Sequence, residues 1–101
     1  MIKAGANVNA AANNGFTALM SACQNGHEQC ARNLLKANAD PNKAGNQGET
    51  ALMLASQNGN EQCARALLEA GARKDATTNQ GSTALSLARR NGHAAISTLL
   101  A

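Results

Sequence analysis

A ten-residue pattern that begins Thr-Ala-Leu occurs three times in the chain at a fixed spacing of 33 residues. The copies start at Thr17, Thr50 and Thr83, and each ends in an Asn-Gly pair. When residues 15–47 are aligned with residues 48–80, 20 of 33 positions are identical. Self-similarity at a period of about 20–50 residues is typical of repeat architectures, in which each unit buries its apolar face against its neighbours. The chain is therefore predicted to be a linear stack of similar units.

The repeats together form one domain over residues 1–101. Residues 15–47 and 48–80 form two full repeats, residues 1–14 the tail of a partial repeat, and residues 81–101 a last repeat without its final loop. This division suggests that the chain is a piece cut from a longer array.

Each full unit is predicted to contain two short helices joined by a tight turn. In the first unit they run over residues 18–24 and 28–37, separated by Asn25-Gly26, where glycine supplies a left-handed cap. The threonine before each first helix is an N-cap candidate. Helices this short are marginal in water, so their stability must come from stacking, and the second unit, with Leu54 in place of Ser21, should have the tightest core.

The order Gly-x-Thr-Ala-Leu, Asn-Gly-His, Leu-Leu and Ala-Asn-Ala-Asp-Pro-Asn at this spacing resembles the ankyrin repeat over nearly all of the chain. The resemblance implies an all-α solenoid of stacked antiparallel helix pairs, with hairpin-like fingers projecting at right angles. It also implies a non-enzymatic module that binds a peptide or partner domain. Met20 and Met53 depart from the histidine that most ankyrin repeats carry, and are expected only to fill volume.

The resemblance also implies which residues contact a partner, because ankyrin proteins usually bind with their finger tips and first helices, which line a concave groove. These positions are Asn13, Asn14, Phe16, Gln24, Asn25, Asn46, Gln47, Glu49, Gln57, Asn58, Asn79, Gln80, Ser82, Arg90 and Asn91. Most are amides, which suit a peptide backbone; alternatively, they form a solvated face copied with the repeat. Phe16, the sole aromatic, is either an interface anchor or packs toward a preceding repeat.

Other chemistry is not indicated by the sequence. His27 and His93 stand two repeats apart and the three cysteines form no Cys-x-x-Cys pair, so no metal site or cofactor is predicted; both histidines are expected to make local hydrogen bonds. Cys30 and Cys63 are expected to be small buried hydrophobes in a reducing, cytoplasmic setting. The weak net charge of +3, even with a basic cluster near Arg73 and Arg90, and the absence of a long apolar run predict no nucleic-acid or membrane partner.

Two alternatives to an independent binding module stay open. One is a regulatory or targeting segment of a larger enzyme, and the other is weak self-association through the end faces, where Leu99 and Leu100 stand. The family resemblance further implies that Asn9 and Asn42 are candidates for asparagine hydroxylation.

Overall fold

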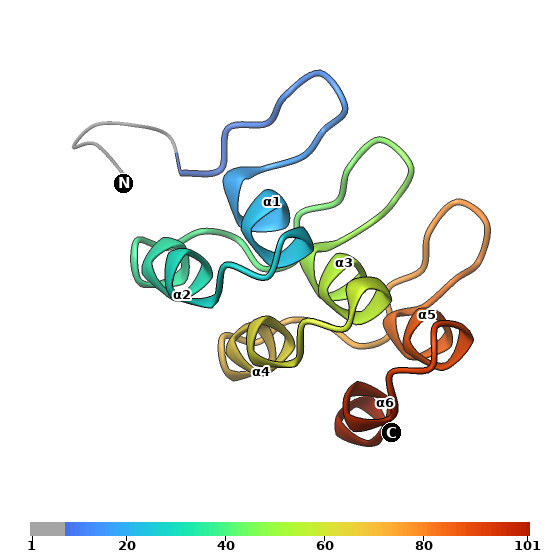
Figure 1. Cartoon of the computed structure of the whole chain (residues 1–101). Helices are drawn as coiled ribbons and strands as arrows, with labels where there is room; N and C mark the ends of the chain where they lie inside the picture. Colours follow the sequence, from blue (N-terminus) through green and yellow to red (C-terminus); the bar gives the residue numbers. More distant parts are fainter. Residues whose placement is uncertain (1–7) are drawn as a thin grey trace.

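The computed structural model describes residues 8–101, which fold into six α-helices arranged in two rows. The helices are α1 (Ala18–Gln24), α2 (Glu28–Lys36), α3 (Ala51–Asn58), α4 (Glu61–Glu69), α5 (Ala84–Arg90) and α6 (Ala94–Leu100). Figure 1 shows α1, α3 and α5 in one row and α2, α4 and α6 in the other, with three loops projecting beyond the first row. We call these loops the fingers: the first comprises residues 8–16, the second residues 37–49 and the third residues 70–82.

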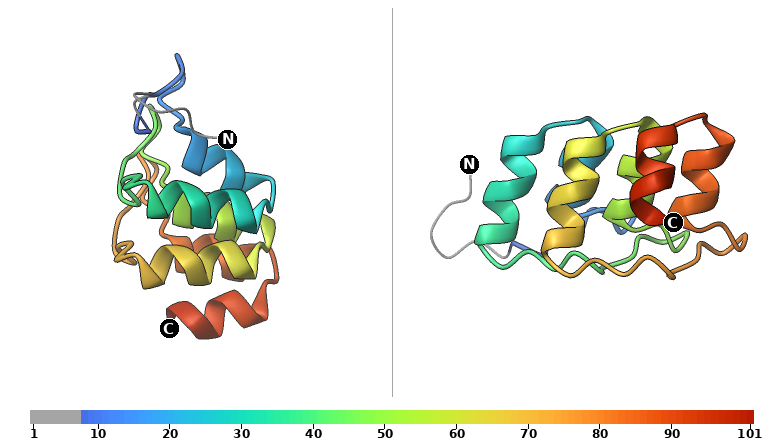
Figure 2. Two further views of the ribbon diagram at one scale, coloured as in Figure 1. Left: turned by 90° about the vertical axis from the view of Figure 1, so that its left-hand side faces the viewer. Right: turned by 90° about the horizontal axis from the view of Figure 1, so that it is seen from below.

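The views in Figure 2 show that successive helix pairs stack side by side along one direction. Each first helix contacts the first helix of the next pair, and each second helix contacts the next second helix. This arrangement confirms the predicted all-α solenoid of paired helices.

The predicted caps of the first helices are present. The side chains of Thr17, Thr50 and Thr83 accept hydrogen bonds from the backbone N–H groups three residues later, at 3.3, 3.3 and 3.1 Å. Each cap satisfies a donor that the helix itself leaves unpaired. Gly26 follows the C-cap residue of α1, and Gly59 is the C-cap residue of α3. Both have φ of +75°, as the predicted left-handed turn requires.

The expectation that methionine only fills volume is wrong at Met53. Its Sδ accepts a hydrogen bond from the backbone N–H of Thr50 at 3.4 Å, and in α5 the Oγ of Ser86 accepts the corresponding bond from Thr83 at 2.9 Å. A thioether is a weak acceptor, but the flexible side chain brings it within reach of this buried donor.

The core lies between the two rows of helices. Leu52 and Leu67 are 1% and 0% exposed, and residues 51–56 of α3 are all buried. The middle unit is covered on both sides, since α3 contacts both α1 and α5. Accordingly, α3 buries more of its residues than α1 or α5 does, while the prediction that its core is the tightest stays a prediction.

The prediction of a buried cysteine pair is half right. Cys63 is 1% exposed, but Cys30 is exposed, because no described helix packs against the outer side of α2. Instead, Cys63 lies near Cys23, which is also buried, and each thiol affects the pKa of the other. All three cysteines are free thiols, and burial raises the pKa of both Cys23 and Cys63.

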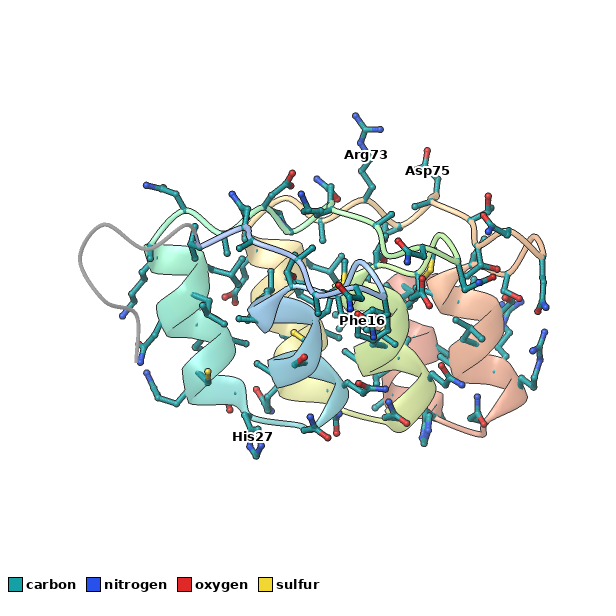
Figure 3. All side chains as sticks on the ribbon, turned by 90° about the horizontal axis from the view of Figure 1, so that it is seen from above. Phe16, His27, Arg73 and Asp75 are labelled. Carbon is teal, nitrogen blue, oxygen red and sulfur yellow. The ribbon has the colours of Figure 1, made fainter. Side chains whose placement is uncertain are left out.

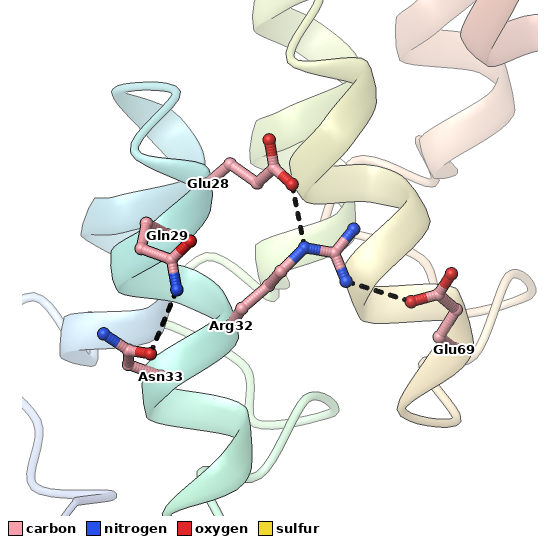
Figure 4. A network of polar contacts seen from close by, with 5 residues as sticks. All are labelled: Glu28, Gln29, Arg32, Asn33 and Glu69. Atoms are coloured by element: carbon pink, nitrogen blue, oxygen red, sulfur yellow. Dashed lines mark hydrogen bonds and ion pairs between the residues drawn. The ribbon is translucent and has the colours of Figure 1, made fainter.

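The second helices are linked by charged side chains on the opposite face of the molecule from the fingers. Arg32 Nε donates to Glu28 on its own helix at 2.8 Å, and its Nη1 donates to Glu69 of the next repeat at 3.1 Å (Figure 4). These bonds raise the pKa of the Arg32 guanidinium. Glu61 and Arg65 form the corresponding i, i+4 ion pair within α4, at 2.8 Å.

Candidate partner-binding groove

The groove is the surface between the fingers and the first helices α1, α3 and α5, and repeated hydrogen bonds give its finger wall a fixed shape. In each finger tip two backbone bonds close a hairpin; in the second finger these run from Gly45 N to Glu49 O at 2.8 Å and from Gly48 N to Gly45 O at 3.0 Å. Gly15, Gly48 and Gly81 each have φ of +82°, a conformation that favours glycine. The same tip is therefore presented three times.

Asparagine side chains tie adjacent finger tips together. Asn46 donates its backbone N–H to Asn14 O at 3.0 Å and its side-chain amide to Asn13 O at 2.8 Å. One repeat later, Asn79 donates in the same way to Gln47 O at 2.9 Å and to Asn46 O at 3.4 Å. Although a partner role was predicted for Asn46 and Asn79, their amide N–H groups hold the fingers in register.

The asparagines at the ends of the first helices are similarly engaged. The side-chain amides of Asn25, Asn58 and Asn91 donate to carbonyl groups four residues earlier, at 2.8, 3.0 and 2.8 Å. Ser21 O and Leu87 O also accept the backbone N–H groups of Asn25 and Asn91, so these side chains add a second hydrogen bond at the end of each helix. Of the predicted amides on this row, Gln24 and Gln57 are exposed, and within the described residues their side chains make no such bond.

Residues at the start of the second helices also join neighbouring repeats, which the sequence analysis did not predict. Asn60 donates its side-chain amide to Cys23 O at 2.8 Å and Gln24 O at 3.1 Å, and the His93 ring is hydrogen-bonded to Gln57 O at 3.0 Å. The expectation of local hydrogen bonds is therefore wrong for His93, because its ring lies beside the preceding repeat. His27 makes no side-chain cap bond and is exposed, projecting from the edge opposite Arg73 and Asp75 in Figure 3.

One part of the groove is hollowed, between the second and third repeats, with a volume of about 290 Å³. We call it the hollow. It is lined by side chains from two fingers and two first helices: Gln47, Glu49, Met53, Leu54, Gln57, Thr78, Gln80, Ser82, Leu87 and Arg90. The structure thus brings together six of the predicted contact residues, namely Gln47, Glu49, Gln57, Gln80, Ser82 and Arg90.

The floor of the hollow was missed in the sequence analysis. Leu54 and Leu87 are 5% and 8% exposed, and each lies at the repeat position that Ser21 occupies in the first unit. Leu54 was assigned to the core, and both leucines do belong to it, but they also line the hollow. The change from serine to leucine at this position was the one sequence signal that could have located the apolar floor.

Two opposite charges line the hollow. Glu49 is half-buried on the finger side, and one oxygen of its carboxylate accepts the backbone N–H of Gln47 at 2.9 Å. Arg90 is exposed at the last turn of α5, and within residues 8–101 it takes part in no ion pair. Neither charge has an ionic partner within the described residues, but the half-buried Glu49 carboxylate already accepts a hydrogen bond, whereas the exposed Arg90 guanidinium makes none there.

Phe16 lies one repeat earlier, beside the second finger. Its side chain is half-buried, and the ring packs toward the following repeat, against Gly45 of the second finger, and not toward a preceding repeat. The role of Phe16 as an interface anchor stays a prediction. A Cβ added to Gly45 would lie 3.1 Å from Cδ1 and Cε1 of this ring. Phe16 lies close to the finger loops in Figure 3. Its counterparts are Glu49 and Ser82, so the ring stands where the next repeat presents a carboxylate.

The remaining predicted residues lie elsewhere. Asn14 accepts the backbone N–H of Phe16 at 3.0 Å. The hydroxylation candidates Asn9 and Asn42 bridge neighbouring fingers, since their side-chain oxygens accept the backbone N–H groups of Asp40 and Arg73, each at 2.7 Å. Their hydroxylation stays a prediction.

Within the described residues 8–101, no group of three or more histidine, cysteine or acidic side chains could hold a metal ion. None of the helices in that range is long and apolar enough to cross a membrane.

Comparison with known proteins agrees with this architecture. A family model described as ankyrin repeats (3 copies) matches residues 39–101, and a model of the single ankyrin repeat matches residues 14–46. No catalytic domain is identified in the chain, and comparison with curated proteins gave no match. Ankyrin repeats generally act as protein-interaction modules. The helix pairs, the fingers and both family matches together show that this chain belongs to the ankyrin repeat family.

Proposed function

We propose that the chain binds an extended segment of a partner protein in its groove, with the hollow between the second and third repeats as the principal contact. The observation that carries this proposal is the composition of the hollow, which combines an apolar floor with unengaged amides. The side-chain amides of Gln47, Gln57 and Gln80 line it and make no hydrogen bond within residues 8–101. An amide can donate to one backbone group and accept from another, so these side chains suit an extended peptide.

The rigidity of the walls supports the same proposal. The finger tips are tied to one another by Asn46 and Asn79, and the second-helix starts are tied to the preceding repeat by Asn60 and His93. A surface held in one shape loses little conformational entropy when a partner binds. This favours recognition by a preformed groove.

The proposal is tested by selecting binders from a displayed library of random peptides and measuring their affinity for two variants. Gln57→Ala/Gln80→Ala removes two amides from the hollow. Gln29→Ala/Gln62→Ala removes two exposed glutamines from the first turns of α2 and α4, outside the groove, and is the matched control.

We expect the hollow variant to weaken binding roughly tenfold, since each lost hydrogen bond contributes about 0.5–1.5 kcal/mol, and the control variant to bind as the wild type does. Selected peptides that bind both variants equally would contradict the proposal. A selection that yields no binder to the folded wild-type chain would do so as well.

A further inference from the structure

The size of the hollow limits what can occupy it. Its volume of about 290 Å³ lies at the lower bound of the roughly 300–1,000 Å³ found for small-molecule sites. The apolar area on its floor is also small, because Leu54 and Leu87 are each less than a tenth exposed. One aliphatic side chain of a peptide suits such a floor better than a larger apolar ligand does.

The charge of the hollow indicates what should lie beside that side chain. Neither Glu49 nor Arg90 has an ionic partner in the described part of the chain, but Glu49 is half-buried and already accepts a backbone hydrogen bond, whereas the guanidinium of Arg90 is exposed and makes no bond there. An opposing carboxylate would give Arg90 such a partner, and the guanidinium fork can hold a carboxylate through two hydrogen bonds.

The distance between the side chains of Leu87 and Arg90 determines how far apart the aliphatic and acidic side chains of the peptide should be. They lie three residues apart on α5, so their side chains are neighbours on one face of the helix, with Cβ atoms about 5–6 Å apart. In an extended peptide, side chains two residues apart point to the same side, about 6.6 Å from one another at a rise of about 3.3 Å per residue. The two spacings agree closely enough for both contacts to form together.

We propose that the hollow recognises an extended segment in which an aliphatic residue and an acidic residue are separated by one position. The aliphatic side chain lies over Leu54 and Leu87, the carboxylate pairs with Arg90, and the glutamine amides hold the backbone between them. This inference rests on the proposed function and adds the chemistry of the partner to it.

The test uses short fluorescein-labelled peptides with flexible glycine flanks, measured by fluorescence anisotropy at low ionic strength. The acidic probes carry Leu-Ser-Asp or Asp-Ser-Leu, so that both chain directions are covered. The comparison probes replace the aspartate with lysine. We expect at least one acidic probe to bind about fivefold or more tightly than its lysine form, and this preference to shrink in high salt.

Two charge reversals locate the effect. Arg90→Glu should invert the preference, so that the lysine probe binds better. Arg73→Glu changes the net charge equally but lies in the third finger outside the hollow, and it should leave the preference unchanged. An equal or better affinity of wild type for the lysine probes would overturn the inference, as would an equal effect of the two reversals.

The outcomes separate this inference from the proposed function. If the peptide library yields binders that depend on Gln57 and Gln80 but carry lysine or arginine beside the aliphatic residue, the groove binds peptides and the acidic preference is wrong. If no selected peptide depends on those glutamines, both statements fail. Enrichment of aliphatic and acidic residues two positions apart supports both.

Discussion

At the scale of single residues, position 16 and its counterparts differ between the repeats that border the groove. Phe16 packs over the backbone of Gly45. Glu49 and Ser82, at the same position in the second and third repeats, line the hollow. The pairing is specific, because a side chain on Gly45 would lie 3.1 Å from the ring. Together with the change from Ser21 to Leu54 and Leu87, this position distinguishes the repeats that line the hollow from the first one.

The buried thiols predict how stability depends on pH. Burial raises the pKa of Cys23 and Cys63 above the value of about 8.5 that a thiol has in an unfolded chain. Their contribution is complete below about pH 8.5 and is lost at higher pH, because the unfolded chain then releases protons that the folded chain retains. Urea unfolding at a series of alkaline pH values should show this loss.

Cysteine variants identify the source of that alkaline loss. In Cys23→Ala/Cys63→Ala the decline in the free energy of unfolding above about pH 8.5 should be shallower than in the wild type. In Cys30→Ala, which removes an exposed thiol, this decline should be as steep as in the wild type. An equal slope in all three proteins would contradict the role given to the buried pair.

The sulfur bond of Met53 predicts a difference between two equivalent methionines. Met53→Leu keeps the volume but leaves the buried N–H of Thr50 without its acceptor, which should cost about 1 kcal/mol. Met20, also 1% exposed, makes no such bond within the described residues, so Met20→Leu should cost less. Urea denaturation of both variants measures the difference, and equal costs would show that the sulfur bond contributes nothing.

At the scale of helices and fingers, the side chains that join one repeat to the next determine how well the groove keeps its shape. Asn60→Ala removes two bonds to carbonyls of the preceding repeat and should destabilise the chain by about 1–2 kcal/mol. His27→Ala, at the same repeat position but exposed and without a cap bond, should change stability little. The midpoint of urea unfolding checks both, and a cost for His27→Ala as large as that for Asn60→Ala would contradict the account.

The helices could be predicted from the sequence because their signals are local. Thr17 as a cap and Asn25-Gly26 as a turn fix the first helix to within a residue, and the 33-residue period repeats it. The joining bonds could not be predicted in this way. Asn60 and His93 reach carbonyls 37 and 36 residues away, and only the stacking geometry brings these groups together.

At the scale of the whole molecule, polar residues at both end faces predict a monomer. Ser21 and Asn33 are exposed at the outer side of the first pair, where later repeats bury Leu54 and Ala66. At the other end Arg89 is exposed where Cys23 is fully buried. Burying such polar groups without partners is unfavourable, so sedimentation velocity should give a single monomeric species at increasing concentration. A shift to larger species would favour end-to-end association instead.

The candidate site was only partly predictable from the sequence because, like the bonds between repeats, it depends on how the repeats stack. The family pattern indicated Gln57, Arg90 and the finger tips, but it could not distinguish amides that face the groove from amides already bonded within the array, such as Asn58. Nor could it show that Leu54 has an edge in the groove while belonging to the core. Both distinctions depend on how neighbouring repeats are placed.

The most direct measurement of the proposed groove is a nuclear magnetic resonance titration of the isotope-labelled chain with the tightest peptide from the library selection. The account predicts that the backbone amide signals that move are those of the second and third fingers, α3 and α5, with Gln47, Gln57 and Arg90 among them. Signals that move mainly on α2, α4 and α6, with those around the hollow unchanged, would contradict it.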